Sequence, residues 1–133
     1  MIDYALEPDL TAGEFIALLQ GTTLGVRRPL AQPDRIDRML READLVVTAR
    51  SEGRLVGVSR ALTDFSFCTY LSDLVVDEAF QHRGIGRELV RRTHEAAGPE
   101  TMLILIAAPG AEAYYPRIGM TQHTSCWFLP RQY

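Results

Sequence analysis

A short run of glycine and basic residues is the part of this sequence best suited to chemistry. Its members are Gln81, His82, Arg83, Gly84, Ile85, Gly86 and Arg87. The run separates a strand-like stretch from an amphipathic helix-like one, so the first N–H groups of that helix lack partners and face the loop. A helix dipole favours negative charge there, the glycines let a ligand approach the backbone, and the arginines add positive charge. The pattern therefore predicts a pyrophosphate-binding loop.

Two other interpretations of this loop were weighed against phosphate binding. A lone Gly-x-Gly is about as often a turn that merely joins a strand to a helix. A dinucleotide-binding loop would carry a third glycine where Leu89 stands, and an acidic residue on the next strand. The next apolar stretch, 102–107, contains no carboxylate, and this disfavours the dinucleotide interpretation.

The elements around the loop predict a layered α/β domain. Strands are predicted at 2–6, 45–50, 55–62, 69–77, 102–107 and 125–129, and helices at about 11–20, 35–43, 84–97 and 111–118. The order is β-α-α-β-β-β-α-β-α-β, with a mixed sheet in which the strands at 69–77 and 102–107 are parallel. Since 102–107 is wholly apolar, we expect it to be buried on both faces, as in a sheet centre.

Composition narrows the function further. The 133 residues fit one domain, 1–133. All 14 basic residues are arginine, so the lysine of a Schiff-base enzyme or a Walker-type NTPase is missing. A net charge of −3 disfavours a nucleic-acid partner. The sequence has neither an apolar run of membrane-spanning length nor a secretory signal pattern, so we expect a cytoplasmic protein without membrane contact. Its cysteines and histidines are not clustered, so we expect no metal site.

Two segments resemble a known family. The stretch 81–86 matches the Gln/Arg-x-x-Gly-x-Gly/Ala motif of GNAT (Gcn5-related N-acetyltransferase) proteins, and 111–120 resembles their Ala-x-x-x-Tyr-x-x-x-Gly-Phe segment. With the predicted element order, the resemblance covers nearly the whole chain. It implies the acyl-CoA N-acyltransferase fold, a mixed central sheet flanked by helices. The sequence departs from the family at Ala108, where an Asn is common, and at Pro116 and Met120, which replace Glu and Phe.

The resemblance also implies a set of cofactor contacts. The co-substrate would be acetyl-CoA, and the loop 81–87 would hold its pyrophosphate. Backbone groups of Leu74, Val75 and Val76 would pair with the pantetheine arm, in a gap where the strands at 70–77 and 102–107 splay apart. Tyr115 matches the family tyrosine near the CoA sulfur, where its phenol could protonate the leaving thiolate, and Tyr114 is assigned to packing.

The base that accepts the amine proton is less defined by the sequence. Asp73 lies between Leu71 and Val75 on one strand face, and partial desolvation would raise the pKa of its carboxyl group toward a useful value. The alternative at this position is a structural carboxylate. The base would then be another carboxylate, with Asp64 as the reserve candidate although it is expected in a turn, or a water chain.

These residues predict an N-acetyltransferase acting on a primary amine of a small molecule or peptide, by direct attack in a ternary complex. A CoA-binding sensor or interaction module without catalysis is the alternative, because the family Asn is missing and the base is undefined. The acidic residues Asp64, Asp73 and Asp77 suggest a cationic amine as acceptor, and an exposed sheet edge would allow a homodimer.

Overall fold

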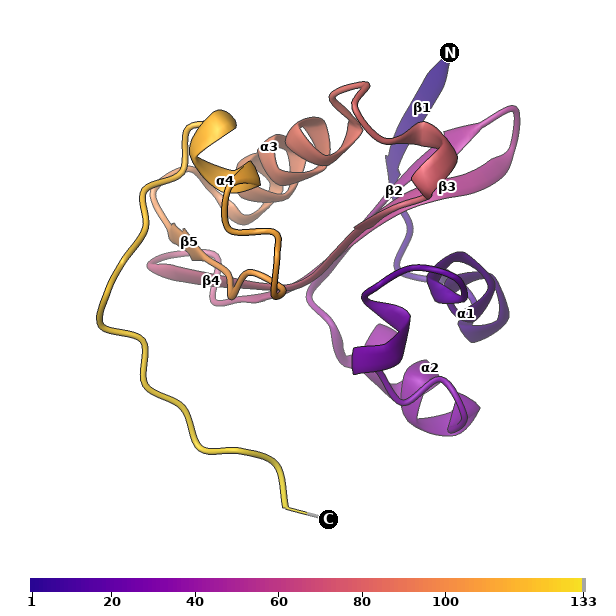
Figure 1. Cartoon of the computed structure of the whole chain (residues 1–133), viewed down its shortest axis with the longest axis horizontal. Coiled ribbons are helices and arrows are strands. Elements are labelled where there is room, and N and C mark those ends of the chain that lie inside the picture. The colour runs from indigo at the N-terminus through magenta and orange to yellow at the C-terminus, as the bar shows by residue number, and fades with distance from the viewer. Residues whose placement is uncertain (133) are drawn as a thin grey trace.

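A single five-stranded sheet with helices on both faces organises the chain (Figure 1). The computed structural model describes residues 1–132. The strands are β1 (Ile2–Leu6), β2 (Leu45–Ser51), β3 (Arg54–Thr63), β4 (Cys68–Val76) and β5 (Met102–Ile104). The helices are α1 (Ala12–Leu19), α2 (Pro33–Glu42), α3 (Ile85–Ala97) and α4 (Tyr114–Arg117), with 3-10 turns η1 (Gly25–Arg27) and η2 (Glu78–Phe80).

The sheet order follows the chain, β1-β2-β3-β4-β5. The first four strands are antiparallel neighbours, and β4 pairs with β5 in parallel across the connection through α3. This confirms the predicted mixed sheet and the predicted β4–α3–β5 unit. Local signals acted as expected: Thr11 caps α1 by accepting a hydrogen bond from the Glu14 N–H at 3.2 Å, and Gly53 turns between β2 and β3 with a φ of 82°.

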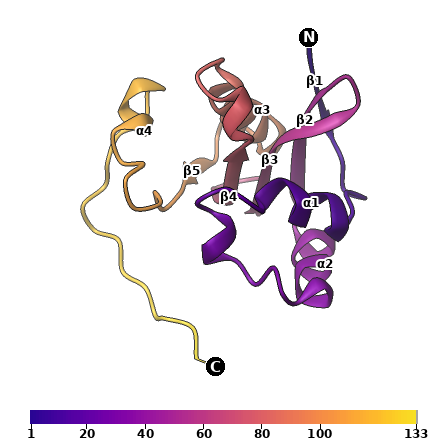
Figure 2. The same ribbon diagram turned by 45° about the vertical axis from the view of Figure 1, so that its right-hand side comes forward.

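Two hydrophobic cores lie on opposite faces of the sheet, giving three layers (Figures 1 and 2). Helices α1 and α2 pack on one face, where Phe15 and Ile36 are fully buried. Helix α3 packs on the other through Ile85 and Leu89. Side chains alternate between the faces along β4, so neighbouring residues of this strand serve different layers. No helix within residues 1–132 is long and apolar enough to cross a membrane.

Two predictions for the C-terminal third are wrong. The stretch 102–107 is not a central strand: β5 covers only three residues at the sheet edge, and Met102 and Ile104 are 68% and 53% exposed. The predicted strand at 125–129 is absent; this segment extends away from the sheet, and Trp127 is 89% exposed. An apolar run indicates a strand but not the neighbours that strand will find, which explains both errors.

Candidate active site

The parallel pairing of β4 with β5 covers only the first three residues of β4 and ends at the pair Tyr70–Ile104. Beyond it, Leu71 and residues 73–76 pair only with β3. A β-bulge follows directly: the register with β3 shifts between Arg60 and Ala61, which leaves Ser72 without a partner. A bulge bends its strand and interrupts the ladder, so it accounts for the divergence of β4 from β5. The pairing thus ends where the sequence predicted a gap between 70–77 and 102–107, although residues 105–107 do not continue the strand.

A buried ion-pair cluster holds this bulge. Asp73 is fully buried and accepts hydrogen bonds from Arg28 Nε at 2.6 Å and Arg60 Nε at 2.5 Å. The same two guanidinium groups reach the bulge, where Arg28 donates to the Ser72 carbonyl at 2.8 Å and Arg60 to the Ser72 hydroxyl at 3.0 Å. Asp73 lines neither of the cavities beside the gap. These contacts fit a structural role for Asp73, which the sequence analysis kept as the alternative to a role as the base.

The loop between β4 and α3 presents unpaired backbone N–H groups. His82 and Gly84 adopt left-handed conformations, with φ of 66° and 79°. The first three N–H groups of α3 find no acceptor among residues 1–132, and the first bond of the helix runs from the Glu88 N–H to the Gly84 carbonyl at 3.1 Å. The Arg83 guanidinium lies over the Phe80 ring, 4.9 Å from its centroid. The loop therefore has the donors and charge that an anion requires.

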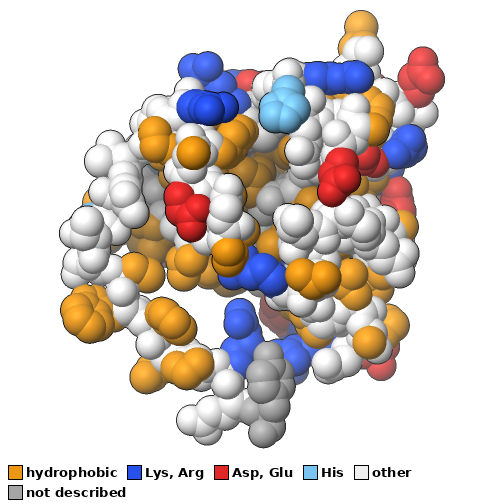
Figure 3. Space-filling view, viewed as in Figure 1, with side chains coloured by type: hydrophobic (Ala, Val, Ile, Leu, Met, Phe, Trp, Pro, Cys, Tyr) orange, Lys and Arg blue, Asp and Glu red, His pale blue; other side chains and the backbone are white. Residues whose placement is uncertain are grey.

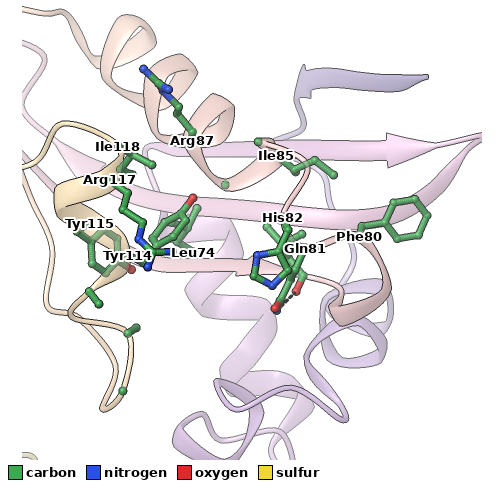
Figure 4. A pocket seen from close by; sticks show the side chains of 16 residues that line it. Leu74, Phe80, Gln81, His82, Ile85, Arg87, Tyr114, Tyr115, Arg117 and Ile118 are labelled. Atoms are coloured by element: carbon green, nitrogen blue, oxygen red, sulfur yellow. Dashed lines mark hydrogen bonds between the residues drawn. The ribbon is translucent and has the colours of Figure 1, made fainter.

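A first cavity of about 540 Å³ runs from this loop to the gap (Figure 4). Leu74 and Val76 line it, whereas Val75 points to the opposite face and packs in the core with α1 and α2. The lining also includes Phe80, Gln81, His82, Gly84, Ile85, Gly86, Arg87, Gly110, Ala111, Ala113, Tyr114, Tyr115, Arg117 and Ile118. In Figure 4 the α4 side chains form one side of this cavity, and those of the loop form the facing side.

A second cavity of about 420 Å³ meets the first one at the gap. Its lining is Leu24, Arg27, Arg28, Tyr70, Leu71, Ser72, Leu74, Leu105, Ile106, Ala108, Tyr115, Cys126, Phe128 and Arg131. Leu74 and Tyr115 line both cavities. A molecule in the first cavity and another in the second would therefore approach each other beside these two side chains.

The two tyrosines of α4 lie at different places in the site. Tyr115 is half-buried between the cavities, and burial raises the pKa of its phenol, which keeps the proton on the oxygen at neutral pH. Tyr114, assigned to packing, reaches the start of α3: a Cβ placed on Gly86 would lie 2.5 Å from its hydroxyl oxygen. The rings of Tyr114 and Tyr115 meet edge-on, with centroids 5.2 Å apart.

The sequence analysis did not predict several residues that line the two cavities. Arg117 lies one turn from the tyrosines in the first cavity, and helical spacing could have indicated it. Arg28 and Arg131 come from segments more than 100 positions apart, so no local pattern signals that they share the second cavity. Among the described residues, no group of three or more His, Cys, Asp or Glu side chains could hold a metal ion.

Sequence comparison identifies one matching domain. A profile described as the acetyltransferase (GNAT) domain matches residues 24–126. This range contains the loop, the gap and both tyrosines. No curated protein matches the chain in sequence.

Solved structures share the whole architecture. A Deinococcus radiodurans protein assigned as an acetyltransferase is 26% identical, with a TM-score of 0.77 over 98% of this chain and 88% of its own. A GNAT-family acetyltransferase from Streptococcus pneumoniae is 18% identical, with a TM-score of 0.79 over 99% of this chain and all of its own. The enzyme AAC(6')-Iy, in complex with a bisubstrate analogue of CoA and acetylneamine, is 14% identical, with a TM-score of 0.73 over 99% of both chains.

Proposed function

Because this chain belongs to the GNAT family of acetyltransferases, whose profile covers residues 24–126, we propose that it moves the acetyl group of acetyl-CoA to a primary amine. The amine belongs to a small molecule or a peptide and attacks directly, within a ternary complex. Family and fold supply the reaction class. The donor, the acceptor and the residue roles are the proposal.

One observation carries this function: two cavities meet at the end of the gap in the sheet and share Leu74 and Tyr115. The first takes the donor and the second the acceptor, so that the amine nitrogen reaches the acetyl carbon where they join. Direct attack requires both molecules to be bound together in near-contact geometry. The fold relative AAC(6')-Iy, bound to an analogue that joins both substrates, is consistent with this arrangement.

The residues of the first cavity suit CoA. The left-handed loop and the free N–H groups of α3 would hold the pyrophosphate, with Arg87 adding charge at the cavity wall. Arg83 does not line the cavity and would act from beside it, over the Phe80 ring. The unpaired edge of β4 at Leu74 to Val76 would pair with the amide groups of the pantetheine arm. The Val76 carbonyl already accepts a bond from Gln81 Nε2 at 3.3 Å, so Gln81 ties the loop to the strand.

Few groups of the protein take part in the acetyl transfer itself. Acetyl-CoA supplies a thioester carbon that is open to attack. As the new N–C bond forms and the C–S bond breaks, the Tyr115 phenol donates its proton to the departing sulfur. The amine proton passes to water, and water returns a proton to the Tyr115 phenolate. Water has this role because Asp73 is enclosed by Arg28 and Arg60 and reaches neither cavity. A free N–H of β4 in the gap stabilises the developing oxyanion.

Thiol release measured with acetyl-CoA and a panel of amines tests the proposal, with calorimetry reporting CoA binding separately. We expect CoA binding, amine-dependent thiol release, and a fall of about 100-fold in kcat for Tyr115→Phe, in the range typical of a general acid. The Tyr70→Phe variant, a tyrosine of the second cavity only, controls for loss of a phenol. CoA binding without turnover on any amine would support the non-catalytic module instead, and the absence of CoA binding would reject both functions.

A further inference from the structure

The second cavity has an uneven charge. Three arginines line it, Arg27 and Arg28 from the η1 region and Arg131 from the C-terminal segment. No aspartate or glutamate among residues 1–132 lines it. Figure 3 shows basic side chains gathered around the opening between the C-terminal segment and the body of the protein. The cavity therefore presents positive charge from two opposite sides.

The three arginines differ in how well they are neutralised. Arg28 shares the buried carboxylate of Asp73 with Arg60, so these three residues together keep one positive charge. Arg27 and Arg131 make no ion pair or side-chain hydrogen bond with any other residue of 1–132. Both are exposed. Two guanidinium groups thus remain available to a ligand, each with several donors in a planar fork.

We propose that the acceptor amine also carries a carboxylate, which Arg27 and Arg131 bind. The inference rests on the proposed function and specifies the substrate class of the second cavity. A guanidinium matches a carboxylate in geometry and can bind it through two parallel hydrogen bonds. The volume of about 420 Å³ suits a small amino acid-like molecule.

The same charges bear on the nucleophile. An amine attacks only when it has lost its extra proton, and nearby positive charge lowers the pKa of a bound ammonium group. The arginines would thus favour the reactive neutral amine, while also repelling an ammonium ion that has no other anchor. A carboxylate on the same molecule provides that anchor. Polyamines and other purely cationic acceptors lack it and are expected to be poor substrates.

The test compares amines that differ only at the far end. Straight-chain ω-amino carboxylates of increasing length are each paired with the alkylamine and the diamine of the same length. We expect kcat/KM to be at least about tenfold higher for the best carboxylate than for these two partners, the ratio given by one charge-assisted hydrogen bond. In the Arg27→Gln/Arg131→Gln double variant, the ratio of carboxylate to alkylamine should fall to near one. The control variant Arg38→Gln changes an exposed residue of α2 outside both cavities, and it should retain the wild-type ratio.

A binding measurement separates the two proposals. With CoA present, the preferred amino carboxylate should raise the melting temperature of the wild type, and the double variant should lose that increase. Such stabilisation without turnover would support the carboxylate site and overturn acetyl transfer. Equal or faster turnover of the alkylamine or the diamine would overturn the carboxylate site and leave acetyl transfer standing. A preference that survives in the double variant would likewise reject the roles of Arg27 and Arg131.

Discussion

Replacing Asp73 with asparagine separates a structural carboxylate from a catalytic one. The substitution keeps the shape of the side chain and leaves Arg28 and Arg60, which are 16% and 9% exposed at the side chain, without their shared anion. Breaking a buried ion pair costs about 3–5 kcal/mol. We expect the lower end, about 3 kcal/mol, because the amide oxygen still accepts one hydrogen bond. With an unfolding entropy of about 2.1 cal/mol/K per residue, this lowers the melting temperature of a 133-residue chain by about 10 °C.

Urea unfolding at neutral pH measures this loss, and Asp77→Asn provides the matched control. Asp77 makes one ion pair, at 2.7 Å with Arg54, whose side chain is 66% exposed. An exposed pair contributes at most about 1 kcal/mol, so the same chemical change should have a small effect there. A loss of similar size in both variants would mean that burial of Asp73 adds nothing.

Activity is then assayed below the melting temperature of the Asp73→Asn variant. A structural role predicts that folded protein still transfers acetyl groups and that the pH dependence of kcat keeps its shape. The affinity for CoA should weaken, because the bulge at Ser72 that opens the gap loses its clamp. The reasoning is refuted by the opposite pattern: stability within about 0.5 kcal/mol of wild type, the range of neutral surface substitutions, together with a loss of the acidic limb in the pH profile of kcat.

Three further outcomes follow from other contacts. Gly86→Ala should weaken CoA binding about tenfold (~1.4 kcal/mol) in calorimetry, because the new Cβ would meet the Tyr114 hydroxyl at 2.5 Å; adding Tyr114→Phe should restore part of the affinity. Because burial raises the pKa of Tyr115 above its ordinary value of 10.0, the alkaline fall in kcat should lie above pH 10 and vanish in Tyr115→Phe. Hydrogen bonding from Arg50 lowers the pKa of Glu7 below 4.5, so this pair stabilises the fold above pH 4.5 and stops doing so as the pH falls through the lowered pKa. Between pH 6 and pH 3, the urea midpoint of Glu7→Gln should therefore decrease less than that of the wild type.

The glycine-rich loop at the start of α3 could be predicted as a structural feature because its signals are local. A glycine at a helix start, in a left-handed conformation, and the free N–H groups behind it depend on a few consecutive residues. The parallel crossover through α3 follows from the same stretch. The bulge at Ser72 could not be predicted in the same way, because it depends on a register between β3 and β4 that no short pattern encodes.

A cationic acceptor stays a prediction, although the structure engages the acidic residues from which it was inferred. The prediction counted the acidic residues Asp64, Asp73 and Asp77, but each of them is occupied elsewhere. The Asp64 carboxylate accepts three backbone N–H groups of the following turn, which lowers its pKa to about 2. Asp73 is shared by two arginines, and Asp77 pairs with Arg54.

The charge that a cavity offers its ligand is therefore set by side chains that lack internal partners. In the second cavity these are Arg27 and Arg131, which lie far apart in the sequence and could not be grouped before the fold was known. Acidic residues outnumber basic ones in the whole chain, 17 to 14, yet the second cavity is lined by arginines. A net charge describes solubility and general association, whereas the proposed acceptor would meet the local charge imbalance of this cavity.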